Sequence, residues 1–324
     1  MRTGLVLGAG GIVGQAYHAG VLAAFDDAGW DARSADVIVG SSAGSVTGSL
    51  LRLGLSASDL AAWATEGEVS EEGAALLEVL GSDLPELPPP SPRDLLHGWR
   101  LPSRSLIGRA IRRPWAFRPG VAALTLLPDG RVDIRDRAQV LDGDERPDGL
   151  WICVARRRDG RRVVLGRRGD GPPSRLSDAV AASCAIPGYL APVTIGGVEY
   201  IDGGVHSPTN ADVLADRGLE VVVVVSPMSC HGILSGVDAP VRWAAQRRLD
   251  RELARLRAGG THVICVAPTR RVLATMGYNA MADDRTDRVA TAGYRQAASL
   301  LRRPGLADRL ALLTGESSAA PAAA

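Results

Sequence analysis

The chain has 324 residues, 46% of them hydrophobic, enough for one large α/β domain or two small ones with a sizeable buried core. Its 37 basic residues, all arginine, nearly balance 36 acidic ones. The resulting net charge of +1 gives no global field that would favour nucleic acid as a partner.

The four cysteines are scattered without CxxC or metal-ligand spacing, which favours buried, reduced thiols and predicts no metal site. The N-terminal apolar run is too short for the core of a signal peptide, and no run reaches the roughly 18 apolar residues of a membrane-spanning helix. These observations predict a cytoplasmic protein.

The first element is a predicted strand over Gly4–Leu7, followed by a glycine-rich turn, Gly8–Gly14, and a helix from about Gln15 to Ala28. Such a turn aims backbone N–H groups from a helix N-terminus at a dinucleotide pyrophosphate or at the oxyanion of an acyl-transfer intermediate. A dinucleotide fold expects an acidic residue at the end of its second strand, and here that strand ends at Gly40. The spacing of the glycines still leaves a nucleotide-dependent oxidoreductase open as an alternative.

The segment Asp36–Val46 is the strongest single signal. A β-branched run leads into the sequence Gly-Ser-Ser-Ala-Gly, and the residues beyond it favour a helix. This matches the GxSxG nucleophile elbow, in which Ser42 projects from a sharp turn between strand and helix. The alternative interpretation is a turn of small residues that packs the helix against the strand.

The middle of the chain predicts a helix over Ser56–Glu66, with Ser56 or Ser58 as its N-cap, and then a proline-rich stretch over Glu86–Pro92. From Arg93 to Arg118 seven arginines and one acid alternate with aliphatic residues and tryptophans. This composition predicts peripheral contact with a membrane, with arginines at the level of the headgroups. The alternative is a cap helix whose apolar face covers the core, and the two interpretations are compatible.

The second half predicts alternating strands and helices, which favours a mainly parallel sheet with helices on both faces. The predicted strands are Leu150–Arg156, its hairpin partner Arg162–Gly166 after a turn at Asp159-Gly160, Val198–Ile201, Leu219–Val225 and Thr261–Ala267. The predicted helices are Leu176–Cys184, Pro208–Arg217, Val241–Arg257 and a terminal one over Arg285–Arg303.

A serine hydroxyl needs a base to become a nucleophile. Four of the five histidines have no motif around them. The fifth, His206, lies four residues beyond Asp202, but it does not fit the Ser-Asp-His order, which has a late histidine and a separate acid. Asp202 follows directly on a predicted strand and precedes Gly203 and Gly204, which allow close approach of another backbone. Asp202 is therefore the predicted base, the alternative being that Asp-Gly-Gly forms an ordinary turn.

Four blocks of sequence together resemble the patatin-like phospholipases. The resemblance covers roughly residues 3–65 and 150–270 and is carried by GAGGIVGQAYHAGVL, GSSAG, ASCAIPGYLAPV and YIDGGVHSPTNADVLADRG. It implies a three-layer α/β/α sandwich and a lipid acyl hydrolase with Ser42 as nucleophile, Asp202 as base and the N–H groups of Gly10 and Gly11 as oxyanion hole. Its substrates would be phospholipids, lysophospholipids or neutral glycerides, with no cofactor. The supporting motif glycines are Gly8, Gly14, Gly40, Gly44, Gly203 and Gly204.

The chain departs from the family pattern in its glycine loop, where Val13 stands at a usually basic position and Ala9 replaces the first glycine. We expect one catalytic domain over residues 1–314, a variable arginine-rich cap over about 67–149, and a disordered tail over 315–324. A non-catalytic lipid-binding regulatory protein would keep the same fold with an idle dyad, and it is the main alternative function.

Overall fold

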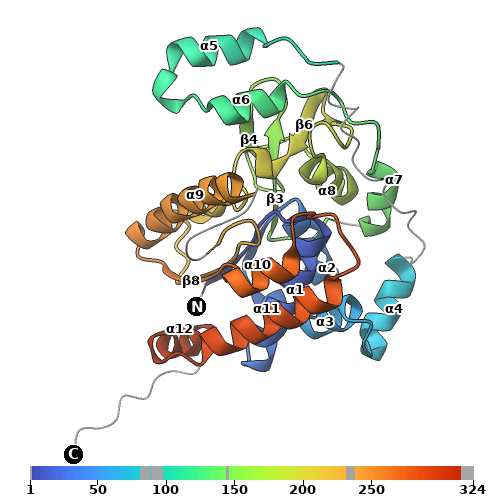
Figure 1. The fold of residues 1–324 in the computed structure, drawn as a ribbon, viewed down its shortest axis with the longest axis vertical. Helices are drawn as coiled ribbons and strands as arrows, with labels where there is room; N and C mark the ends of the chain where they lie inside the picture. The colour runs from blue at the N-terminus through green and yellow to red at the C-terminus, as the bar shows by residue number, and fades with distance from the viewer. Residues whose placement is uncertain (1, 81–87, 89–97, 144–145, 231–237, 315–324) are drawn as a thin grey trace, which may run out of the picture.

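The computed structural model of the chain describes residues 2–80, 88, 98–143, 146–230 and 238–314 (Figure 1). The predicted disordered tail over 315–324, most of the proline-rich stretch, residues 93–97 and His231 lie outside the described residues.

The centre of the fold is an eight-stranded sheet with the order β5-β6-β3-β2-β1-β7-β8, and β4 also pairs with β3. Its strands are β1 (Thr3–Leu7), β2 (Val37–Ser41), β3 (Leu150–Arg156), β4 (Arg161–Leu165), β5 (Val193–Ile195), β6 (Val198–Asp202), β7 (Val221–Val225) and β8 (His262–Val266). The five strands from β3 to β8 along this order are parallel, whereas β4, β5 and β6 pair antiparallel.

The parallel strands are buried on both faces, which explains their continuous apolar sequences. In β1, Leu5 and Leu7 belong to the core on one side of the sheet, and Val6 belongs to the core on the other. The first core is built with α1 (Gly11–Asp27), α2 (Ala43–Arg52), α8 (Leu176–Cys184) and α11 (Thr286–Leu301), and the second with α9 (Ala239–Ala258). The protein is thus a three-layer α/β/α sandwich, as predicted (Figure 1).

The remaining helices surround this sandwich. They are α3 (Ala57–Ala64), α4 (Glu71–Leu80), α5 (Arg104–Arg112), α6 (Pro119–Thr125), α7 (Arg135–Ala138), α10 (Arg270–Met276) and α12 (Pro304–Thr314). Figure 1 shows α5 and α6 at the end of the molecule opposite to α12. Ser56 caps α3 by accepting a hydrogen bond from the Asp59 N–H, which confirms one of the two predicted N-caps.

The arginine-rich segment is partly packed and partly exposed. Leu106 of α5 is buried, and its helix is fastened to the β3–β4 turn because Ser103 Oγ and Arg109 Nη1 donate to the carbonyls of Arg158 and Asp159. The other apolar side chains do not cover the core, since Ile107, Ile111 and Trp115 are 48%, 74% and 82% exposed. Leu106 is thus buried, whereas the cap-helix interpretation is wrong for Ile107 and Ile111 of α5. Within the described ranges, no helix is long and apolar enough to cross a membrane.

Three predicted elements differ from the structure. Helix α1 begins at Gly11, several residues before the predicted start, and α11 is followed by a further helix, α12. The predicted helix over Pro208–Arg217 is wrong, because only Ala211–Leu214 form a short 3-10 helix. Asn210 at φ 55° adopts the left-handed conformation, which an α-helix cannot continue through.

Candidate active site

Ser42 occupies the sharp corner between β2 and α2. It is the N-cap residue of α2, with φ 51° and ψ −122°, a conformation that non-glycine residues rarely adopt. Strain of this kind is concentrated at functional sites and is the signature of the nucleophile elbow. The hydroxyl consequently lies at the positive end of the α2 helix dipole, where a developing negative charge is stabilised.

The two glycines of the elbow are required by close backbone contacts. A Cβ on Gly44 would lie 1.9 Å from the carbonyl oxygen of Leu7, and one on Gly40 would lie 2.6 Å from that of Gly44. These distances are too short for any side chain, so β1, β2 and α2 can meet at this corner only because both residues lack a Cβ.

A buried chain of hydrogen bonds fixes the backbone of Ser42. The Ser42 N–H donates to Ser183 Oγ at 2.9 Å, and Ser183 Oγ donates to the carbonyl of Cys153 at 2.8 Å. Ser45 Oγ donates to the Ser42 carbonyl at 2.7 Å. The backbone of the strained residue is therefore tied to α8, to β3 and to its own helix, which keeps the hydroxyl in one place.

Asp202 ends β6 and is brought to Ser42 by the pairing of β6 with β3 and of β3 with β2. The carboxyl group is buried, and its Oδ1 accepts the Gly204 N–H at 2.6 Å. Burial raises the pKa of Asp202, while hydrogen bonding from the Ser42 hydroxyl and the Gly204 N–H lowers it, and the result is about 6. Ser42 and Asp202 thus lie together, with the carboxyl able to change protonation state near neutral pH.

The two glycines after Asp202 let this loop pack against its neighbours. A Cβ on Gly203 would lie 2.1 Å from the Cys153 carbonyl oxygen, so only glycine fits there. A Cβ on Gly204 would lie 3.2 Å from the Cβ of Ala9, which places the aspartate loop against the glycine loop after β1.

Asn210 connects the residue before Ser42 with the loop that follows Asp202, and sequence reasoning missed it. Its side-chain amide donates to Ser41 Oγ at 2.9 Å, to the Gly203 carbonyl at 3.3 Å and to the Ser207 carbonyl at 2.7 Å. It is fully buried, and it thereby fixes the residue before Ser42 relative to the residue after Asp202. Asn210 precedes the short 3-10 helix in the left-handed conformation, so the predicted helix cannot run through it.

The glycine loop presents the N-terminus of α1 to the same region. The Val13 N–H donates to the Ala280 carbonyl at 3.1 Å and the Gly14 N–H to the Gly10 carbonyl at 2.9 Å. The preceding N–H groups, of Gly10, Gly11 and Ile12, lie where a helix supplies no carbonyl acceptor. Gly11 has φ +63°, and a Cβ there would lie 2.4 Å from the Ala280 carbonyl oxygen, so this turn needs glycine.

A cavity of about 440 Å³ opens on Ser42. Most of its lining is apolar and comes from the helices α1, α2, α3, α4, α7 and α8 and the loops around them. The lining residues are Gly11, Ile12, Gln15, Ser42, Ala43, Val46, Leu50, Trp63, Leu77, Ile134, Arg137, Ala138, Val140, Leu141, Val180, Cys184, Ile186, Leu190 and Met281. Gly11 and Ser42 therefore line the same mostly apolar cavity.

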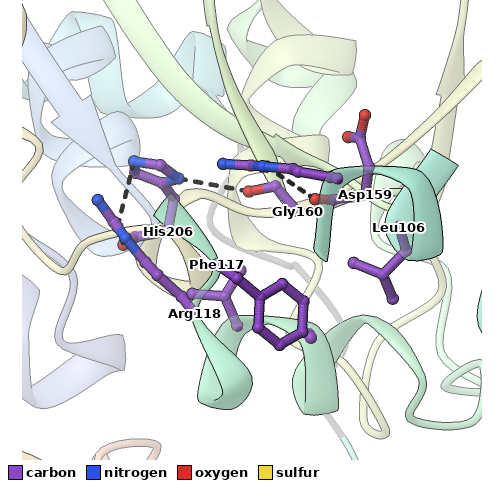
Figure 2. Close-up of a pocket in the computed structure, with 9 residues that line it drawn as sticks. Leu106, Phe117, Arg118, Asp159, Gly160 and His206 are labelled. Carbon is purple, nitrogen blue, oxygen red and sulfur yellow. Dashed lines mark hydrogen bonds between the residues drawn. The ribbon is translucent and has the colours of Figure 1, made fainter. Parts of the chain in front are cut away.

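His206 lines a separate, much smaller cavity, together with Leu106, Phe117 and Arg118 of the arginine-rich segment (Figure 2). The Nδ1 of His206 lies 3.3 Å from the Gly160 carbonyl oxygen, and Arg118 Nη1 donates to the His206 carbonyl at 3.1 Å. Burial, together with the positive charges of Arg162 and Arg118, lowers the pKa of His206 to about 3. This histidine is a structural contact between the cap and the aspartate loop.

The cysteines and the other buried histidine contribute no reactive group near neutral pH. Burial raises the pKa of Cys184, which lies beside Ser45, to about 12 and lowers that of His18 to about 3. Over the described ranges, no three His, Cys, Asp or Glu side chains gather as they would around a metal ion.

The comparison with known families gives the class of protein. A family model described as patatin-like phospholipase matches residues 5–215, and the chain therefore belongs to the patatin-like phospholipase family. The sandwich described above is accordingly a patatin fold, and membership of the family supports lipid acyl hydrolase activity.

Among solved structures, the chain is similar to VipD from Legionella pneumophila. The two share 15% sequence identity with a TM-score of 0.44, over 93% of this chain and 66% of the VipD chain. This chain therefore spans slightly less than two thirds of that protein. A comparison with curated protein sequences gave no significant match.

Proposed function

We propose that this protein hydrolyses carboxylic esters of lipids through an acyl-serine intermediate, with Ser42 as nucleophile and Asp202 as general base. The observation that carries the proposal is the pairing of a strained serine with a buried carboxyl whose pKa is about 6, at the edge of an apolar cavity. A base with a pKa near the working pH is efficient in proton transfer.

In the first half of the reaction, Ser42 Oγ attacks the ester carbonyl carbon and its proton passes to Asp202. The carbonyl oxygen becomes an oxyanion, which accepts hydrogen bonds from the N–H groups of Gly10 and Gly11. The carbon–oxygen bond to the alcohol then breaks, and the proton on Asp202 goes to the departing alkoxide.

In the second half, water attacks the acyl-serine and gives its proton to the same carboxylate. Collapse of that intermediate releases the fatty acid, and the proton returns to Ser42. Each half therefore ends with Asp202 ionised. Ile12 lines the cavity beside Gly11, and its N–H at the start of α1 is a further candidate donor for the oxyanion.

The substrate would be a phospholipid, a lysophospholipid or a neutral glyceride. The apolar lining supports this, because burial of a fatty acyl chain contributes about 0.8 kcal/mol for each methylene removed from water. The walls that would hold the chain come largely from α7 and the residues after it, from α8 and from Leu77 of α4.

The proposal is tested with p-nitrophenyl esters of increasing chain length. We expect the unmodified protein to hydrolyse them, and Ser42→Ala and Asp202→Asn to lose at least about a thousandfold in kcat/KM. Ser58→Ala, at an exposed serine that donates to Asp26, is the matched control and should keep full activity. Equal rates for all four proteins would refute the dyad, and lipid binding without hydrolysis would favour the non-catalytic alternative.

We also propose peripheral membrane contact through the segment Arg93–Arg118. Ile107 and Ile111 are one helical turn apart in α5, are both exposed, and are followed by the exposed Trp115. Arg104, Arg112 and Arg113 are exposed around them. Apolar side chains with arginines beside them suit insertion between anionic headgroups.

Flotation with vesicles tests this contact. We expect binding to phosphatidylglycerol vesicles that weakens as salt is added, and at least a tenfold loss for the double variant Ile111→Ser/Trp115→Ala. Trp243→Ala removes another exposed tryptophan, on α9, and should bind normally. If the double variant floats as well as the unmodified protein, the contact lies elsewhere.

A further inference from the structure

The cavity beside Ser42 contains one charged side chain among its described lining residues, that of Arg137. A cation is unexpected in a cavity built to hold an acyl chain, because an ionised group buried without a partner is strongly unfavourable. Its position therefore needs a physical reason.

Packing holds Arg137 in this wall. It lies in α7, and the next residue, Ala138, is buried against the core together with Leu141 in the turn that follows. Helix α7 also lies along α8, the helix that carries Ser183 below the catalytic serine. The backbone of Arg137 is thereby fixed to the same element that supports Ser42.

The guanidinium group of Arg137 has a donor to spare. Its Nη1 is buried and meets no hydrogen-bond acceptor in the part of the chain that the structure describes. Arg135, two residues earlier on the same helix, contrasts with it, since Arg135 is exposed and its Nη2 lies 2.6 Å from Asp133 Oδ2. The helix thus carries one arginine that is paired with an aspartate and one that lines the cavity and has a buried nitrogen without an acceptor among the described residues.

We propose that Arg137 binds the phosphate group of the substrate, so that the enzyme acts on glycerophospholipids or lysophospholipids in preference to neutral glycerides. This inference rests on the proposed function. A guanidinium group presents its donors in a planar fork that matches two phosphate oxygens, and charge-assisted hydrogen bonds of this kind are the strong ones.

The substrate's own geometry fits this arrangement. In a glycerophospholipid the phosphorus is only a few bonds from the ester carbonyl carbon, so a phosphate and an ester bound in one cavity lie close together. The ester would be at Ser42, the acyl chain along the apolar lining and the phosphate at Arg137. The other anion of suitable chemistry is the carboxylate of a released fatty acid, and the experiment must separate the two.

The test compares octanoyl lysophosphatidic acid with monooctanoylglycerol, which share the ester, the glycerol and the chain and differ in the phosphate. For Arg137→Gln we expect the ratio of kcat/KM for the phosphate-bearing lipid to kcat/KM for monooctanoylglycerol to fall by roughly ten- to a hundredfold. This is the size of effect expected when a hydrogen bond to a charged group is lost. The matched control is Arg135→Gln, which should keep the ratio within about twofold because that arginine is already paired. An unchanged ratio in Arg137→Gln would overturn the inference.

A binding measurement separates failure of this inference from failure of the proposed function. In the Ser42→Ala background, titration calorimetry with both lipids below their micelle concentrations should show the phosphate preference and its loss on adding Arg137→Gln. A preference present without any Ser42-dependent hydrolysis would refute the enzyme and keep the phosphate site. Inhibition by octanoate that depends on Arg137, together with an unchanged lipid ratio, would assign the arginine to the product carboxylate and overturn the phosphate assignment.

Discussion

The burial of Asp202 predicts that the catalytic carboxyl destabilises the folded protein at the pH where it works. The pKa rises from 3.8 to about 6 on folding, and one unit corresponds to about 1.4 kcal/mol. The folded state therefore holds the proton more tightly than the unfolded state. At a pH below the pKa of Asp202 in the unfolded chain, this tighter proton binding stabilises the folded state by the full amount of about 3 kcal/mol. The stabilisation is lost as the pH rises through about 6.

Asp202→Asn removes this dependence, because asparagine keeps nearly the same shape and stays neutral at every pH. Its amide oxygen can still accept the Gly204 N–H. We expect the variant to be more stable than the unmodified protein by up to about 3 kcal/mol at pH 8, and the advantage to be smaller by roughly 1.4 kcal/mol at pH 5.

Urea unfolding at both pH values measures the difference. Asp308→Asn, at an exposed aspartate of α12, is the control and should show no pH-dependent gain. A variant of Asp202 that is less stable than the unmodified protein by the same amount at both pH values would refute the reasoning, since it would mean that the carboxyl is not penalised by burial.

Three further predictions follow from the site. The kcat/KM for a neutral ester should fall tenfold per pH unit below about pH 6, as one proton is taken up by Asp202, and a flat profile down to pH 5 would contradict its function as base. Gly44→Ala should cost roughly 1–3 kcal/mol in urea unfolding, because its Cβ meets a backbone carbonyl at 1.9 Å, whereas Gly108→Ala in the open part of α5 should be neutral or stabilising. Asn210→Asp sets a carboxylate against Ser41 Oγ and two carbonyl oxygens, and should cost at least about 3 kcal/mol; unfolding at the midpoint of the unmodified protein would refute the bridging function.

Local patterns in the sequence were sufficient to predict most of the sheet. The β-branched run of β7 and the apolar run before Ser42 predicted the bounds of their strands nearly to the residue. Strands buried on both faces leave such an unbroken apolar sequence. The elbow was predictable for a related reason, since two close backbone contacts require glycine at fixed distances from the serine. The short β5 and the helix α12 have no pattern as strong, and they were missed.

Features that depend on distant residues could not be predicted. Asn210 joins segments far apart in the chain, and its conformation overrides a helical pattern of ordinary strength. The cavity wall around Arg137 is assembled from several helices, so its unpaired nitrogen is visible only in three dimensions. This chain has Val13 where the glycine loop of the family usually has a basic residue. Here α1 begins at Gly11, and the Val13 N–H donates to the Ala280 carbonyl. The assignment of residues 1–314 to one domain and the functions of the dyad remain predictions.

The central claim is that Ser42 is an activated nucleophile, and labelling with a fluorophosphonate followed by peptide mapping tests it independently of any substrate. We expect one phosphonylated site, on the peptide that carries Ser42, in the unmodified protein and in Ser58→Ala, with labelling slowed at least a hundredfold in Asp202→Asn. Labelling on a different serine, or at an equal rate in Asp202→Asn, would contradict the account.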